Sequence, residues 1–221
     1  NPFGDDLELG QRIEFVYSTK QNTWVDKKGN KLGFAIQQDF YTQMAIEGRA
    51  YQVKAGEISA PAVGDIKITD TAAEMCVDIA SGTTVIPVYA NVSINLAVNL
   101  LTEVAGKSVG ALATVGAAFV PLPLLMGGPS AVATARVAET GSAATGVTVA
   151  AEVSTTTLRH FSFDQPIQAG AWDTTFDWEP KAPPVLSGVS CFYIQVAANL
   201  TAGPSYYAHF DFIELPTANI S

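Results

Sequence analysis

Two alternating runs near the C-terminus constrain the fold of this chain more than any other feature. The runs are Cys191 to Leu200 and Tyr206 to Leu215, and the turn between them, Thr201 to Ser205, is rich in Gly, Pro and Ser. Apolar residues at every second position are typical of a β-strand with one face in a core. The pattern predicts a β-hairpin that buries Phe210 and Phe212. The residues of its other face, expected to meet solvent or a neighbouring subunit, are Tyr207, His209 and Asp211.

Similar runs recur along the chain. We expect strands over residues 11–17, 48–54, 65–69, 73–79, 83–96, 146–153, 155–163 and 171–178. Residues 34–44 fit a strand or a short helix, and we favour the strand. Residues 97–113 are interpreted as strand and loop, with a helix as the alternative, because two glycines there would each cost a helix about 1 kcal/mol. Pro87 indicates an edge position or a bulge, because proline cannot donate to the ladder.

This pattern predicts an all-β fold, a single jelly roll or antiparallel β-sandwich of about eight or more strands. Residues 1–10 are polar and acidic, and we expect them to form a flexible N-terminal arm, with residues 11–221 as the single domain. The sequence begins at Asn1 without a basic region followed by an apolar run, so no signal peptide is expected.

The chain is poor in charged residues. They make up 15% of the 221 residues, against about 25% in a typical soluble domain, which predicts that other chains cover part of the surface. The formal charge of −9 argues against a basic groove, so no direct nucleic-acid binding is expected. Cys76 and Cys191 lie in apolar alternating runs and are interpreted as two buried thiols, with a single bridge between them as the alternative.

The middle of the chain contains 28 consecutive residues without a charge, from Ser108 to Ala135. A membrane-spanning segment needs about 20 apolar residues, so the length permits one. Several prolines and glycines argue against a spanning helix, and no Lys or Arg cluster flanks the segment. We favour an apolar strand followed by a loop that is buried or covered by a neighbouring subunit; peripheral contact with lipid is the alternative.

No set of residues has the spacing of a catalytic, cofactor-binding or metal-binding site. His160 and His209 are far apart in sequence. Asp211 lies two residues from His209 on the same strand face, but no HxH or HxxxH spacing supports a metal site, which usually needs three protein ligands. Asp5 and Asp6, with Glu8, lack a calcium-loop pattern. There is no nucleophile elbow and no Gly-rich phosphate loop. We therefore predict that the protein is not an enzyme and uses no cofactor or metal.

Residues 172–179 form the cluster that most resembles an active site. On a strand, one face carries Asp173, Thr175 and Asp177, and the other carries Trp172, Thr174, Phe176 and Trp178. Paired carboxylates near tryptophans suit a glycosidase or a carbohydrate-binding surface. Outward acids and inward aromatics are also what an ordinary sandwich strand shows, and we favour that interpretation.

Several short segments resemble the jelly-roll structural proteins of viruses, above all those of bacterial and archaeal viruses. They are Ile79 to Ile94 (IASGTTVIPVYANVSI), Glu47 to Tyr51, Pro183 to Leu186 and Phe212 to Pro216. The resemblance implies a capsid or other virion protein without catalytic residues. It also implies that the uncharged middle segment contacts neighbouring subunits or an internal membrane of the virion.

The main functional hypothesis is therefore a viral structural protein, a capsid protein that self-assembles into the virion shell. Its expected partners are copies of itself and other virion proteins, and its expected location is the virion. The alternative is a carbohydrate-binding or adhesin module, with Trp172, Trp178, Tyr206 and Tyr207 as the residues that stack on sugars. A third hypothesis is a hydrolase that uses Asp173, Asp177 or Glu179.

Overall fold

The structure is a computed structural model, and it describes residues 15–18, 23–26, 40–69, 71–95, 100–138, 146–167, 174–198 and 203–219. The chain divides into two units, Asn1–Phe40 and Tyr41–Ser221. The first unit contains an antiparallel pair of strands, β1 (Phe15–Ser18) and β2 (Thr23–Asp26). The sequence predicted a boundary after residue 10; of the alternating run at 11–17, the structure describes residues 15–17, which lie in β1. The predicted arm, residues 1–10, lies outside the described residues.

The second unit is built from two antiparallel sheets. The strands of the first, the β17 sheet, are β3 (Ala50–Ala55), β4 (Ala62–Val63), β7 (Thr83–Asn95), β10 (Leu122–Pro123), β14 (Thr174–Trp178), β15 (Leu186–Ser187) and β17 (Ser205–Pro216). The strands of the second, the β16 sheet, are β6 (Met75–Ile79), β8 (Leu100–Val109), β9 (Ala117–Phe119), β11 (Thr134–Val137), β13 (Leu158–Ile167) and β16 (Ser190–Ala198). The remaining elements are β5 (Ala72–Ala73), which pairs with β12 (Val147–Thr148), the helix α1 (Phe40–Ile46) and the 3-10 turn η1 (Thr217–Asn219).

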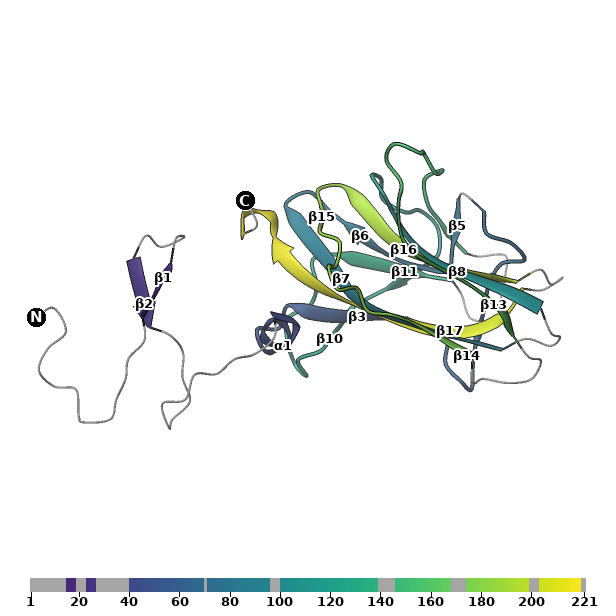
Figure 1. The fold of residues 1–221 in the computed structure, drawn as a ribbon, viewed down its shortest axis with the longest axis horizontal. Helices are drawn as coiled ribbons and strands as arrows, with labels where there is room; N and C mark the ends of the chain where they lie inside the picture. Colours follow the sequence, from purple (N-terminus) through teal and green to yellow (C-terminus); the bar gives the residue numbers. More distant parts are fainter. Residues whose placement is uncertain are drawn as a thin grey trace, which may run out of the picture. The chain divides into compact units, whose positions relative to one another are not determined.

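The order of the strands identifies the fold as a jelly roll. The β17 sheet has the order β10-β3-β17-β7-β14, and the β16 sheet the order β13-β8-β16-β6-β11-β9. Following the eight principal strands β3, β6, β7, β8, β13, β14, β16 and β17 along the chain, every connection crosses from one sheet to the other except that from β8 to β13 (Figure 1). This is the double Greek key of a jelly roll, and it confirms the predicted fold class.

The two C-terminal runs form strands, but the predicted hairpin is wrong. β16 pairs with β6 and β8, whereas β17 pairs with β3 and β7. The two strands therefore lie in different sheets and face each other across the core. The buried face was predicted correctly, since Phe210 and Phe212 are fully buried while Tyr207 and His209 lie half-buried on the outer face. Asp211, expected to meet solvent or a neighbouring subunit, is instead buried and accepts hydrogen bonds from the Tyr41 hydroxyl and the Gln52 amide of the same chain. Alternation determines which face of a strand is buried, and it does not determine which strand lies beside it.

Two other segments differ from the sequence prediction. Within the favoured strand at 34–44, residues 34–39 lie outside the described part, and α1 begins at Phe40. A helix forms here because it places Met44 against Ile86 and Ile213 on the outer face of the β17 sheet. Residues 65–69 form no strand, and Asp65 makes only an isolated parallel bridge.

Two further predictions are confirmed, whereas the strand predicted over residues 146–153 is reduced to β12, two residues long. Residues 100–109 form the strand β8, not a helix. Pro87 marks a bulge in the middle of a sheet, because Tyr89 lies opposite Asp211 while Pro87 lies opposite Phe212, which leaves Val88 as the extra residue. Pro87 also falls in the part of β7 that neither β14 nor β15 pairs with, so its missing N–H leaves no ladder bond unmade there.

Candidate functional site

The uncharged middle segment carries much of the exposed apolar surface of the second unit. Its exposed large aliphatic residues are Leu112, Val115, Val120, Leu122, Leu124, Leu125, Met126 and Val132. In the described part of the chain, no helix is both long enough and apolar enough to cross a membrane. All but the first two residues of the segment belong to residues 110–157, which we call the β8–β13 connection.

Five of these exposed residues fall within seven positions of the sequence, and we call this stretch the apolar corner: Val120, Leu122, Leu124, Leu125 and Met126. The strand β9 extends the edge of the β16 sheet beside β11, and β10 extends the edge of the β17 sheet beside β3. The chain between them therefore turns around the edge of the sandwich. Met126 is 97% exposed. Single apolar residues are common on protein surfaces, whereas a contiguous group of them marks a contact site.

Hydrogen bonds and packing hold the apolar corner in place. The N–H of Leu124 donates to the carbonyl of Ala50 at 3.0 Å, and the N–H of Gly128 donates to the carbonyl of Leu125 at 2.7 Å. The second bond closes a turn with Met126 at its tip, and Gly127 has a φ of 76° as such a turn requires. The turn presents Met126 from a fixed backbone.

Glu214 fastens the next part of the connection to the end of β17. Its two carboxylate oxygens accept the N–H groups of Val132 at 2.9 Å and Ala133 at 2.6 Å. A cavity of about 500 Å³ lies at the same end of the sandwich. Residues that line it include Arg49, Tyr51, Pro129, Val132 and Glu214.

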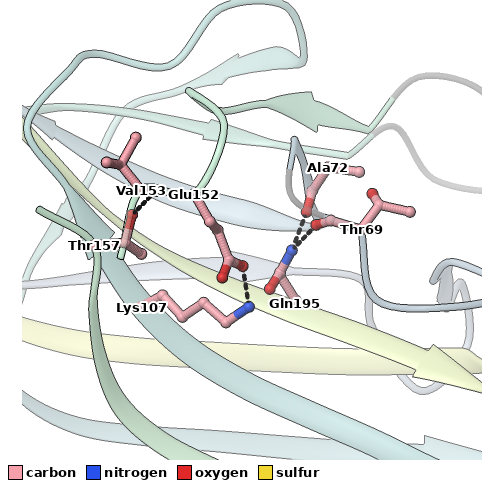
Figure 2. Close-up of polar contacts among 7 residues, drawn as sticks. All are labelled: Thr69, Ala72, Lys107, Glu152, Val153, Thr157 and Gln195. Carbon is pink, nitrogen blue, oxygen red and sulfur yellow. Dashed lines mark hydrogen bonds and ion pairs between the residues drawn. The ribbon is translucent and has the colours of Figure 1, made fainter. Parts of the chain in front are cut away.

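Other described residues of the connection pack on the outer face of the β16 sheet. Lys107 is buried on β8 and forms an ion pair with Glu152 of the connection. Beside it, the amide nitrogen of Gln195 donates to the carbonyls of Thr69 and Ala72, both at 2.6 Å, as Figure 2 shows. Two loops are therefore fixed on this face, and they enclose a second core. Its members are Ala73, Cys76, Val109, Ala113, Val147, Val149, Cys191 and Tyr193.

The acidic and aromatic cluster on β14 is arranged as an ordinary sandwich strand, as we favoured. Phe176 and Trp178 are buried in the main core, while Asp177 is exposed on the outer face. Asp177 accepts hydrogen bonds from the Tyr89 hydroxyl and the Asn91 amide, each at 2.7 Å. The hydrogen bonds from Tyr89 and Asn91 lower the pKa of Asp177.

Two of the residues proposed to stack on sugars are not exposed. Trp178 and Tyr206 are buried in the core and cannot meet a ligand, which corrects that part of the alternative hypothesis. Tyr207 lies half-buried on the outer face of β17, and Trp172 and Asp173 lie outside the described residues.

The two histidines occupy different sheets. His160 on β13 lies 2.9 Å from the Ser108 hydroxyl, and burial lowers its pKa. His209 on β17 lies beside Tyr89, with ring centroids 5.6 Å apart. They share no site.

Cys76 and Cys191 are free thiols and both are buried, as interpreted from the sequence. A hydrogen bond with Cys76, together with burial, raises the pKa of the Cys191 thiol. The sequence did not reveal that Asp78 lies beside both cysteines, because Cys191 is far from the other two residues along the chain. Only the pairing of β6 with β16 brings the three together.

No protein-family model, curated protein or solved structure matches this chain. Its function is therefore inferred from the fold and the surface.

Proposed function

We propose that this chain is a structural protein of a virion shell, a capsid protein that assembles with copies of itself. The observation that carries the proposal is the apolar corner on a jelly-roll sandwich. Jelly rolls are common in viral capsids, and also in lectins. Exposed apolar side chains that are contiguous mark a surface that another molecule covers.

The composition of the apolar corner supports a protein partner. Methionine is enriched and charge is depleted at the centres of protein interfaces, and the corner contains Met126 with no charged residue between Ser108 and Ala135. The fixed backbone of the corner reduces the entropy lost on association. A shell protein needs such a surface in every copy, and a low charge of 15% over the whole chain fits extensive coverage.

The test is assembly of the full chain. We expect the purified protein to form larger species as its concentration rises, measured by light scattering, and ordered particles in electron micrographs. Met126→Glu and Leu125→Glu should abolish both, because each places a charge in the covered surface. Val185→Glu is the matched control, since Val185 is exposed and is not part of the connection but directly precedes β15 in the sequence, and it should assemble as the wild type does.

A wild-type chain that stays monomeric at all concentrations would contradict the proposal, and so would equal loss of assembly in the control. Vesicle co-sedimentation tests the alternative for this segment, which is peripheral contact with lipid. Binding to vesicles that Met126→Glu abolishes, without assembly, would make lipid the partner of the corner.

A carbohydrate-binding module is the second candidate, on a different surface from the predicted one. The outer face of the β17 sheet carries Tyr89, Asn91, Asp177 and His209 on three neighbouring strands. Aromatic rings beside amide and carboxylate groups can stack on a sugar and bond its hydroxyls. A glycan array with wild type and Tyr89→Ala tests it: no bound glycan, or equal binding by both, would remove this candidate.

The hydrolase hypothesis gains no support. A general acid needs a raised pKa, whereas the hydrogen bonds to Asp177 lower its pKa.

A further inference from the structure

Three potential metal ligands meet under the β8–β13 connection. The sulfurs of Cys76 and Cys191 and a carboxylate oxygen of Asp78 all lie within 4.8 Å of one another. Cys191 lies directly opposite Asp78 in the pairing of β16 with β6, and Cys76 precedes Asp78 by two residues on the same outer face. All three residues are at least 95% buried, with exposed fractions of 0% for both cysteines and 4% for Asp78.

The position of the two thiols suits shared ligation better than a disulfide. Cys191 pairs with Asp78 and Cys76 pairs with Tyr193, so the cysteines are diagonal neighbours across the two strands. Diagonal neighbours have Cα atoms about 7–8 Å apart, whereas a disulfide usually needs about 4.4–6.8 Å. Both thiols are free in the structure.

The spacing of the donor atoms fits a tetrahedral metal ion. A Zn–S bond of about 2.3 Å places two ligand sulfurs ~3.8 Å apart in a tetrahedral site. The donor atoms lie within 4.8 Å of one another, so small side-chain movements bring them into range. Thiolates favour zinc and other soft metals over magnesium or calcium.

The charges around the cluster also balance. Two thiolates and one carboxylate carry three negative charges, and Zn²⁺ with the guanidinium of Arg136 supplies three positive ones. Arg136 Nε lies 3.3 Å from one oxygen of Asp78, and the N–H of Ala113 donates to the other at 2.7 Å. Such outer partners orient a ligating carboxylate, and a neutral total charge lowers the penalty for burying the ion.

We propose that Cys76, Asp78 and Cys191 bind one Zn²⁺, with water in the fourth position. The ion would join β6 to β16. Through Ala113 and Arg136, which both contact Asp78, it would also join the β8–β13 connection to the sheet. The site is structural, and it does not depend on the proposed function in a shell.

The first measurement is the metal content of the full chain, purified without chelator under reducing conditions. We expect elemental mass spectrometry to find about one zinc ion per chain. Cys76→Ser and Cys191→Ser should each reduce zinc at least tenfold. Thr83→Ser, a similarly small change on β7 in the other sheet, is the control and should keep its zinc.

A second measurement uses the wild type alone, and it decides the matter even where a serine variant fails to fold. The chelator-treated chain is titrated with Co²⁺, and thiolate ligation should give a charge-transfer band that saturates at one equivalent. Absence of both zinc and this band would overturn the proposal. So would zinc that remains in the folded Cys76→Ser and Cys191→Ser variants, or a disulfide found between the two residues in the purified chain.

Discussion

The rings of Phe192 and Phe210 meet edge to face in the middle of the sandwich, with centroids 5.4 Å apart and planes at 70°. Phe192 lies on β16 and Phe210 on β17, and both are fully buried. Neighbouring rings extend the contact, since Phe192 also stacks with Trp178 and Phe210 lies beside Phe212. The pair joins the two sheets at strands that are consecutive in the sequence.

This pair predicts a large loss of stability on truncation. Phe192→Ala and Phe210→Ala should each lower the free energy of unfolding by about 3–5 kcal/mol, because each leaves a cavity in the core. The double variant should lose less than the sum by about 0.5–1.5 kcal/mol, the coupling of an aromatic pair. Urea unfolding measures all three, with Tyr207→Ala on the outer face as the control. An additive double variant would show that the rings do not interact.

Replacement of Val115 should stabilise the protein. Val115 is a β-branched residue with a φ of 58°, a left-handed backbone that such side chains rarely adopt. Val115→Asn should raise the free energy of unfolding by about 1 kcal/mol, because asparagine tolerates this conformation. Val132→Asn changes an exposed valine elsewhere in the same connection and should have no such effect. Equal melting temperatures for Val115→Asn and the wild type would show that the strain is absent.

Gly106 predicts that even one methyl group is too large on the inner face of β8. A Cβ at Gly106 would lie 2.1 Å from a carbon of the Phe161 ring, whereas one at Gly110 would have no neighbour within 4 Å. Gly106→Ala should therefore destabilise the chain by about 1–3 kcal/mol through overpacking. Gly110→Ala should be close to neutral, and thermal unfolding measures both variants. A larger loss of stability in Gly110→Ala than in Gly106→Ala would contradict the packing of Phe161.

The carboxylate of Glu214 should be required to hold part of the β8–β13 connection in place. Glu214→Ala leaves the N–H groups of Val132 and Ala133 without their acceptor, at a cost of about 1–3 kcal/mol. Hydrogen exchange at these two amides should become faster, and Glu214→Gln, which keeps one oxygen, should lie between the wild type and the alanine variant. Unchanged exchange in Glu214→Ala would show that other contacts hold the segment.

Glu74 predicts a pH dependence of stability. Burial, followed by the charge of Asp65, raises its pKa well above the ordinary value of 4.5. The folded chain therefore keeps a proton that the unfolded chain releases, so this contribution to stability is lost as the pH rises above 4.5 towards the raised pKa. The advantage of the wild type over Glu74→Gln in urea unfolding should shrink as the pH rises above 4.5. A difference between the wild type and Glu74→Gln that stays constant with pH would contradict the shift.

The sequence predicted which faces of the strands are buried, because side-chain alternation is local. Phe176 and Phe210 follow directly from it. The sequence prediction failed for the arrangement of β16 and β17. Alternation does not distinguish two strands that pair side by side in one sheet from two strands that pack face to face across the core. The helix α1 was missed for a related reason, since Met44 is held by Ile86 and Ile213, which are distant in the chain.

The candidate sites depend even more on distant partners. The uncharged segment was visible in the sequence, and the structure shows that Met126 lies at the tip of an exposed turn. Asp78 could not be placed beside Cys191 without the register of β6 and β16. Long-range register is the quantity that local periodicity lacks.

The position of β17 has a consequence for synthesis. It lies between β3 and β7 in the middle of its sheet, yet it follows the other seven principal strands in the chain. A ribosome must therefore translate those seven before this sheet can close. During that time the inner edges of β3 and β7 remain open, and unpaired edges invite strands from neighbouring nascent chains. A newly made chain is thus most in need of a chaperone just before its final strand emerges.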